Sequence, residues 1–142
     1  MTVRLDHANL IVRDVDATTR FLQAAFPDFR VRGSGGPSGA RWVHVGNDVT
    51  YLALNEATGD AAERWVPYGG KPGLNHLGFE VDDAEAVRDR LRAAGYHETT
   101  VPNAHPARTR VYFNDADGND WEFVQYLTDD VDKRNDYELP DS

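Results

Sequence analysis

Three residues of the types that bind metal ions stand at matching places in the two halves of this sequence. His7 lies in the segment Arg4-Leu-Asp-His-Ala-Asn-Leu-Ile-Val, His76 lies in Gly73-Leu-Asn-His-Leu-Gly-Phe-Glu-Val, and Glu122 follows the run Asp115-Ala-Asp-Gly-Asn. Two imidazoles and one carboxylate form the donor set of a facial metal site, which leaves coordination positions open for a substrate and for oxygen. The sequence therefore predicts a metal centre with His7, His76 and Glu122 as ligands.

The alternation of polar and apolar residues places these side chains on one side of their strands. His76 is followed by the apolar residues Leu77, Phe79 and Val81 at alternate positions, and Glu122 lies between Trp121 and Phe123. A carboxylate between two large apolar residues is costly to bury unless it is paired or bound to a metal. For any one of the three residues alone, a hydrogen-bonded or ion-paired structural role is the simpler interpretation. Three of them at related strand positions favour metal binding.

The elements that must position these residues occur in the same order twice. The first half predicts a strand at 3–12, a helix from Asp14 to about Phe26, and strands at 29–32, 40–46 and 49–55. The second half predicts a strand at 74–81, a helix from about Asp83 to Ala94, and strands at 96–101, 108–114 and 120–127. The offset is 69 residues at the first strand and about 71 at the last, and an internal repeat is strong evidence of fold. We expect an α+β fold in which two βαβββ modules, 3–56 and 74–127, form a curved mixed sheet with a cleft.

Caps and turns separate these elements. Asp14 can cap the first helix, while Asp82 and Glu85 have capping-box spacing before the second, which should end at Gly95. We expect a flexible loop at 33–39, a hairpin turn at Asn47-Asp48 and a tight turn at 115–119. Residues 57–72 link the modules of one domain, 1–127, and residues 128–142 form an acidic, loosely ordered tail.

Composition narrows the function classes. The chain of 142 residues has no cysteine, which excludes disulfides, thiolate metal sites and a cysteine nucleophile. Its net charge of -9 disfavours binding to nucleic acid and to anionic membranes. With no long apolar run and nothing typical of a signal peptide at its N-terminus, we expect a cytoplasmic protein that acts on a small molecule.

The double βαβββ pattern, the histidines at the strand starts and the run from Asp115 to Glu122 resemble the vicinal oxygen chelate superfamily. This superfamily includes glyoxalase I, fosfomycin and bleomycin resistance proteins, methylmalonyl-CoA epimerase and type I extradiol ring-cleavage dioxygenases. The resemblance covers residues 3 to about 127 and implies the fold. The chemistry must be argued from the site, because the superfamily hosts several reactions.

Two further segments are similar to the extradiol dioxygenases. The order of His105, five residues, an apolar residue and Tyr112, followed by Gly118 and Glu122, resembles their signature, with Ala116 where that signature has proline. The segment 40–46 resembles the strand that carries their acid–base histidine. The resemblance implies that His44 transfers protons and that His105 and Tyr112 bind the substrate hydroxyl or the ring-cleaving intermediate.

Structural roles stay open for these three residues: His44 can fill a sheet face, His105 can be a polar loop residue, and Tyr112 can be a packing aromatic. His97 has the character of a plain surface residue.

Alignment of the last strands of the two halves places Tyr51 at the position of Glu122, where glyoxalase I-like members use a second carboxylate. A three-ligand site with open positions suits a non-haem iron oxygenase better than an octahedral isomerase site.

The sequence thus predicts a metal-dependent oxygenase that cleaves a small catecholic or similar vicinal-oxygen substrate. The expected metal is iron(II), with manganese(II) as an alternative and zinc or nickel as possible occupants after purification. A lyase or isomerase using the same metal, and a binding protein that sequesters a small aromatic compound, are the alternatives.

We expect the cleft wall to include Trp42, Tyr51, Phe113 and Trp121. We also expect the protein to form a homodimer, because each module has open sheet edges.

Overall fold

The computed structural model describes residues 2–59, 66–102 and 104–139. The chain forms two compact units, residues 1–64 and 65–142, and each predicted module falls within one of them. The units are described separately below. Within the described residues, no helix is long and apolar enough to span a membrane.

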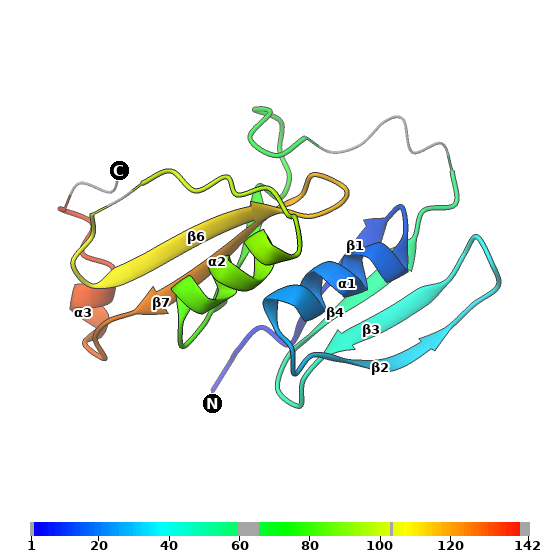
Figure 1. The fold of residues 1–142 in the computed structure, drawn as a ribbon, viewed down its shortest axis with the longest axis horizontal. Helices are drawn as coiled ribbons and strands as arrows, with labels where there is room; N and C mark the ends of the chain where they lie inside the picture. The colour runs from blue at the N-terminus through cyan, green and yellow to red at the C-terminus, as the bar shows by residue number, and fades with distance from the viewer. Residues whose placement is uncertain (1, 60–65, 103, 140–142) are drawn as a thin grey trace. The chain divides into compact units, whose positions relative to one another are not determined.

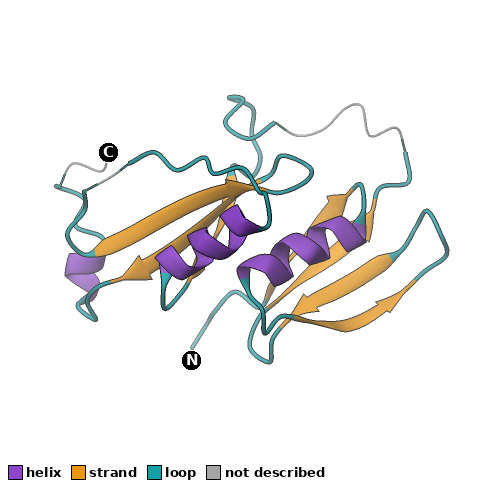
Figure 2. Ribbon diagram, in the orientation of Figure 1, coloured by secondary structure: helices purple, strands orange, loops and turns teal. Residues whose placement is uncertain are grey.

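The first unit is a four-stranded sheet with a helix on one face (Figures 1 and 2). Its elements are β1 (His7–Val12), α1 (Val15–Ala25), β2 (Arg30–Gly35), β3 (Trp42–Gly46) and β4 (Tyr51–Glu56). The strand order is β1-β4-β3-β2, in which β1 and β4 are parallel and the other neighbours are antiparallel. This is the predicted βαβββ module.

Helix α1 begins as its sequence predicts. The carboxylate of Asp14 accepts hydrogen bonds from the backbone N–H groups of Asp16 and Ala17, which satisfies two donors at the helix start. The apolar stripe that includes Phe21 and Leu22 is fully buried. The opposite face of the sheet is therefore left for polar and functional side chains.

Strand β2 is longer than predicted and includes part of the expected glycine-rich loop. Gly33 and Gly35 pair with β3, and the indole of Trp42 covers both glycines. A Cβ atom at Gly35 would lie 2.9 Å from Nε1 of Trp42, so a larger residue would displace the ring. These glycines allow Trp42 to pack on the strand. The local sequence alone does not distinguish such a strand from a flexible loop.

The second unit is a three-stranded sheet with a helix on one face (Figure 1). Its elements are β5 (His76–Glu80), α2 (Ala84–Ala93), β6 (Arg108–Asn114), β7 (Asp120–Tyr126) and the short helix α3 (Val131–Arg134). The strand order is β5-β7-β6, with β5 parallel and β6 antiparallel to β7.

The strand predicted at 96–101 is reduced to one isolated bridge between Glu98 and Phe113. The backbone N–H of Thr99 donates to the carbonyl of Tyr112, as in a ladder. The N–H of Tyr112, however, donates to the side-chain hydroxyl of Thr100 at 2.9 Å. A side chain thus takes the place of a backbone acceptor, and regular pairing stops there.

The N-cap of helix α2 is Asp83, one residue after the predicted Asp82. The predicted capping box between Asp82 and Glu85 is therefore wrong. The carboxylate of Asp83 accepts the N–H of Ala86. The helix ends as predicted at Gly95, which has φ +87 and allows the N–H of Tyr96 to bond the carbonyl of Leu91.

The two predicted turns are confirmed. Asn47 bonds the backbone of Val49 and Thr50 between β3 and β4. At 115–119, the carboxylate of Asp115 accepts two backbone N–H groups and also the indole N–H of Trp121, at 2.9 Å. This turn fixes the start of β7, which carries Glu122.

The C-terminal segment has more structure than its composition predicts. Arg108 donates to the carbonyl of Arg134 and to the side chain of Asn135, and the guanidinium of Arg134 lies over the ring of Tyr126. These contacts tie α3 to the ends of β6 and β7.

Candidate functional site

His76 and Glu122 meet on the sheet face of the second unit that is opposite the core. Nε2 of His76 lies 3.0 Å from Oε2 of Glu122, and 32% and 15% of these side chains are exposed. Trp121 and Phe123, which flank Glu122, are buried on the other face. The predicted strand parity is therefore confirmed, and two of the three predicted ligands are in contact.

Gly78 leaves space beside the Glu122 carboxylate. The two residues are paired in the register of β5 and β7. A Cβ atom at Gly78 would lie 3.3 Å from Oε2 of Glu122, which is tighter than nine in ten real Cβ contacts. A glycine at this position therefore leaves the Glu122 carboxylate uncrowded by the neighbouring strand.

Tyr112 and Arg110 complete the surroundings of Glu122. Tyr112 pairs with Glu122 across β6 and β7, and its ring meets that of His76 edge-on at 5.6 Å between centroids. Burial and the charge of Glu122 raise the pKa of Tyr112 to about 12, so its hydroxyl keeps its proton at neutral pH. Nε of Arg110 lies 4.0 Å from Oε1 of Glu122. The site thus offers a hydrogen-bond donor and a cation next to the carboxylate.

A hydrogen-bond network on the other side of His76 includes Tyr68. The sequence assigns this residue only to the segment 57–72 that links the two modules. The Tyr68 hydroxyl donates to Oδ2 of Asp120 at 2.8 Å and lies 3.1 Å from Nδ1 of His76. Thr99 donates to Oδ1 of the same carboxylate at 2.7 Å. Tyr68 has φ +61, a left-handed conformation that side chains rarely adopt and that costs about 1–3 kcal/mol. No local pattern predicts this contact.

His7 and His44 lie in the first unit, on the sheet face opposite α1, and the ring of Tyr51 stands between them. His7 stacks on Tyr51 at 4.7 Å between centroids, and its Nδ1 lies 2.8 Å from Oδ2 of Asp6. The ring of His44 lies 5.0 Å from Tyr51 and 5.1 Å from Trp42. The hydrogen bond from His7 lowers the pKa of Asp6 below its usual value. His44 is half-buried, so it remains accessible from this face.

The pairing register corrects the predicted alignment of the two halves. His7 pairs with Tyr51, and His76 pairs with Asp120, so the offset is 69 residues at the last strand as well as at the first. The equivalent of Glu122 is therefore Ala53 and not Tyr51. The conclusion drawn from the alignment is unchanged, because neither residue supplies a second carboxylate.

Two residues expected in the wall of a cleft belong to the core. Phe113 and Trp121 are 0% and 1% exposed. Both lie on strand positions that face α2, alternating with Tyr112 and Glu122. Trp42 and Tyr51, by contrast, do lie on an accessible sheet face.

His105 is buried, with 5% of its surface exposed, and does not share the contacts of Tyr112. Its Nδ1 accepts the N–H of Ala107 at 3.1 Å, which places the ring proton on Nε2. That Nε2 atom has no hydrogen-bond partner within the described residues. His97 is exposed, as predicted.

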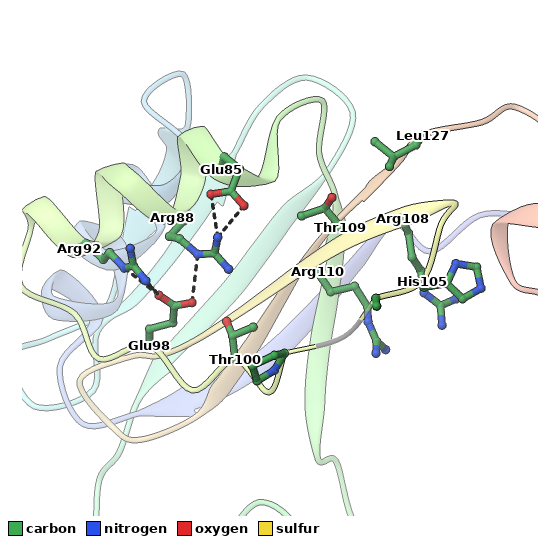
Figure 3. A pocket seen from close by; sticks show the side chains of 12 residues that line it. Glu85, Arg88, Arg92, Glu98, Thr100, His105, Arg108, Thr109, Arg110 and Leu127 are labelled. Atoms are coloured by element: carbon green, nitrogen blue, oxygen red, sulfur yellow. Dashed lines mark hydrogen bonds and ion pairs between the residues drawn. The ribbon is translucent and has the colours of Figure 1, made fainter. Parts of the chain in front are cut away.

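His105 lines a cavity of about 790 Å³ beside β6 and α2 (Figure 3). Four arginines and two glutamates line it as well: Arg88, Arg92, Arg108, Arg110, Glu85 and Glu98. Figure 3 shows Arg88 bonded to both glutamates and Arg92 bonded to Glu98. Much of this wall is thus an internal ion-pair network.

The donors present fit a divalent metal ion in part. An imidazole nitrogen and a carboxylate oxygen converge at His76 and Glu122, with space beside them at Gly78. In the described part of the chain, no group of three or more His, Cys, Asp or Glu residues is arranged to hold an ion. His7, the third predicted ligand, belongs to the other unit.

Comparisons with known proteins agree with this architecture. The chain is similar to the structure of a glyoxylase/bleomycin resistance protein/dioxygenase domain from Frankia sp. EAN1pec, with a TM-score of 0.74 and 22% identity over 95% of this chain and 99% of that one. It is also similar to the fosfomycin resistance protein FosX from Listeria monocytogenes, with a TM-score of 0.70 and 22% identity over 94% of this chain and 99% of that one.

A second FosX structure from Listeria monocytogenes, complexed with Mn(II) and sulfate, has a TM-score of 0.66 and 21% identity over 94% of this chain and 98% of that one. At such identities the likeness shows a shared fold. No curated protein matches the sequence. The family model of the Glyoxalase/Bleomycin resistance protein/Dioxygenase superfamily matches residues 4–123, and the chain therefore belongs to that superfamily.

Proposed function

We propose that this protein is a metal-dependent enzyme of the ring-cleaving oxygenase type, acting on a small catecholic or similar vicinal-oxygen substrate. The observation that carries the proposal is the convergence of Nε2 of His76 and Oε2 of Glu122 beside the open position at Gly78. His7 is the proposed third ligand, from the same chain or from a second copy. Iron(II) is the expected metal and manganese(II) the alternative.

The metal, when bound, supplies a positive charge that lowers the pKa of a substrate hydroxyl and brings the reactants together. The protein's own groups must then move protons and hold the substrate. His44 suits proton transfer, because an imidazole can accept and donate a proton near neutral pH. It is half-buried and lies between the rings of Trp42 and Tyr51, which also offer faces for a planar substrate.

Tyr112 and His105 are the proposed substrate-binding donors. The pKa of Tyr112 is raised to about 12, so its hydroxyl can donate a hydrogen bond to a developing negative charge. The proposed role of His105 rests on the sequence resemblance, since its buried ring lines the cavity of Figure 3, whose lining does not include Tyr112. Arg110, which lies 4.0 Å from Glu122, adds a positive charge that favours an anionic intermediate.

The absence of a second carboxylate favours an oxygenase over a glyoxalase I-like isomerase. In the register of the first unit, the positions equivalent to Asp120 and Glu122 are Tyr51 and Ala53. Three ligands leave positions for both a bidentate substrate and oxygen.

A lyase or isomerase reaction that uses the same metal and no oxygen is the second candidate. One FosX structure holds Mn(II), and FosX is a fosfomycin resistance protein. Sequestration of a small aromatic compound without turnover is the third.

Oxygen consumption separates these candidates. Anaerobically purified protein loaded with iron(II) is mixed with a panel of catechols in an oxygen electrode, and ring cleavage is followed by absorbance. The proposal expects oxygen uptake that is lost in His76→Ala and retained in His97→Ala, an exposed histidine used as the control. Consumption of fosfomycin without oxygen uptake favours the second candidate, and saturable binding without turnover favours the third.

A further inference from the structure

Tyr68 contacts His76 on the ring nitrogen that does not face Glu122. Its hydroxyl lies 3.1 Å from Nδ1 of His76 and 2.8 Å from Oδ2 of Asp120. Nε2 of the same imidazole lies 3.0 Å from Glu122. The histidine is therefore held between a phenol on one side and a carboxylate on the other.

The direction of these hydrogen bonds follows from the donors available. The carboxylate of Asp120 can only accept, and Thr99 already donates to its Oδ1. The single proton of the Tyr68 hydroxyl is then directed to Oδ2, and the phenol oxygen can only accept from His76.

A proton on Nδ1 leaves the lone pair of neutral His76 on Nε2. Nε2 and Oε2 of Glu122 are then two acceptors 3.0 Å apart, an arrangement that requires a positive charge between them; a proton supplies it in the metal-free protein, and a bound metal ion can take the place of that proton. Metal-binding histidines commonly donate their other ring N–H to a fixed acceptor, which sets the tautomer and the ring orientation.

We propose that Tyr68 is a positioning residue whose hydroxyl, anchored by Asp120, holds His76 in the Nδ1-protonated tautomer and so presents Nε2 as the ligand atom. This inference rests on the metal centre proposed above. Tyr68 itself is fixed at both ends, because its backbone N–H donates to the side chain of Asn75 at 3.1 Å. Its left-handed backbone conformation, φ +61, persists only where surrounding contacts determine it, as they do at many functional sites.

The tautomer can be read without any metal. Metal-free protein with isotope-labelled histidine is studied by long-range proton–nitrogen NMR under mildly alkaline conditions. Wild-type His76 should carry a proton on Nδ1, either alone or together with a proton that Nε2 shares with Glu122. Tyr68→Phe, which keeps the ring and removes the hydroxyl, should shift His76 towards the Nε2–H form. Tyr137→Phe removes a hydroxyl from an 89% exposed tyrosine and should leave the spectrum unchanged.

Manganese(II) binding, measured by calorimetry on the same three proteins, gives the second readout. Loss of an outer partner of a ligand typically weakens metal binding about 10–100-fold, which is the loss expected for Tyr68→Phe and not for Tyr137→Phe. An Nε2–H tautomer in the wild type, or an unchanged tautomer in Tyr68→Phe, would overturn the role of Tyr68. Wild-type protein with the Nδ1–H tautomer and no manganese binding would instead contradict the metal centre while supporting the action of Tyr68 on His76.

Discussion

Nε2 of His76 lies 3.0 Å from Oε2 of Glu122, although 46 residues separate the two in the sequence. The parallel pairing of β5 with β7 brings them together, since Gly78 stands opposite Glu122 and His76 is on the same face two residues earlier. The contact brings together a nitrogen and an oxygen atom of the types that bind metal ions.

The presence of glycine at position 78 should affect metal binding at this site. Gly78→Ala places a Cβ atom 3.3 Å from Oε2 of Glu122, so the carboxylate must move by a few tenths of an ångström. We expect manganese(II) affinity to fall by up to about tenfold, because ligand geometry is disturbed, with little change in stability. Calorimetric titration tests this, with Gly59→Ala as the control because a Cβ there meets nothing within 4 Å. Equal affinity of the two variants would show that the gap at Gly78 does not serve the site.

His44 should affect turnover and not metal binding. The side chain contacts the rings of Trp42 and Tyr51, and His44→Gln keeps a polar group of similar size there. If His44 transfers protons, turnover should fall about 10²–10⁴-fold while metal content stays at the wild-type level. Steady-state assays together with metal analysis separate the outcomes. Unchanged turnover would assign His44 a structural role, and loss of metal would mean that the ligand set is wrong.

The sequence could predict those features of the fold that depend on neighbouring residues. Asp14 caps α1, Gly95 ends α2, and Asp115 closes the turn before β7, because each acts on backbone groups within a few positions. Strand parity likewise placed His76 and Glu122 on one face.

Features that depend on distant residues were missed. Gly33 and Gly35 belong to a strand because Trp42, from the next strand, lies on them. Tyr68 reaches His76 and Asp120 through a backbone conformation that no composition rule assigns to tyrosine. The equivalence of Ala53 with Glu122 needed the observed register, since alignment of short strands tolerates a shift of two residues without changing the face.

The ion-pair network of Figure 3 should make stability depend on pH through Glu98. Partial burial raises the pKa of this carboxyl, but hydrogen bonds from Thr100 and Arg92 and the charge of Arg88 outweigh it, and the pKa lies below its ordinary value of 4.5. A lowered folded-state pKa stabilises the protein above the unfolded-state pKa, and this stabilisation is lost as the pH falls through the folded-state value.

Glu98→Gln should therefore lower the free energy of unfolding by about 1 kcal/mol at neutral pH, and the difference from wild type should vanish in acid. Denaturant unfolding across the pH range measures it, with the exposed residue Glu138 changed to Gln as the control. A difference that stays constant down to low pH would exclude the ionised carboxylate as its cause.

We expect the protein to form a homodimer. β1 and β2 are the edge strands of the first sheet, and Ile11 and Val31 on them are 75% and 48% exposed. Exposed edges with apolar residues are commonly covered by a partner. Sedimentation at micromolar concentration tests this expectation, and a monomer would contradict it.

Mixing His7→Ala chains with Glu122→Ala chains should restore some activity if ligands are shared between copies, and none if each site lies within one chain.

Metal analysis of anaerobically purified protein is the direct test of whether His76 and Glu122 bind a metal ion. Wild-type protein and the His97→Ala control should each contain one divalent metal per site, whereas His76→Ala and Glu122→Gln should contain almost none. All four proteins should show the same fold by circular dichroism, since the sheet does not depend on these ligands. Full metal content in His76→Ala, or none in wild-type protein after incubation with iron(II) or manganese(II), would contradict the account.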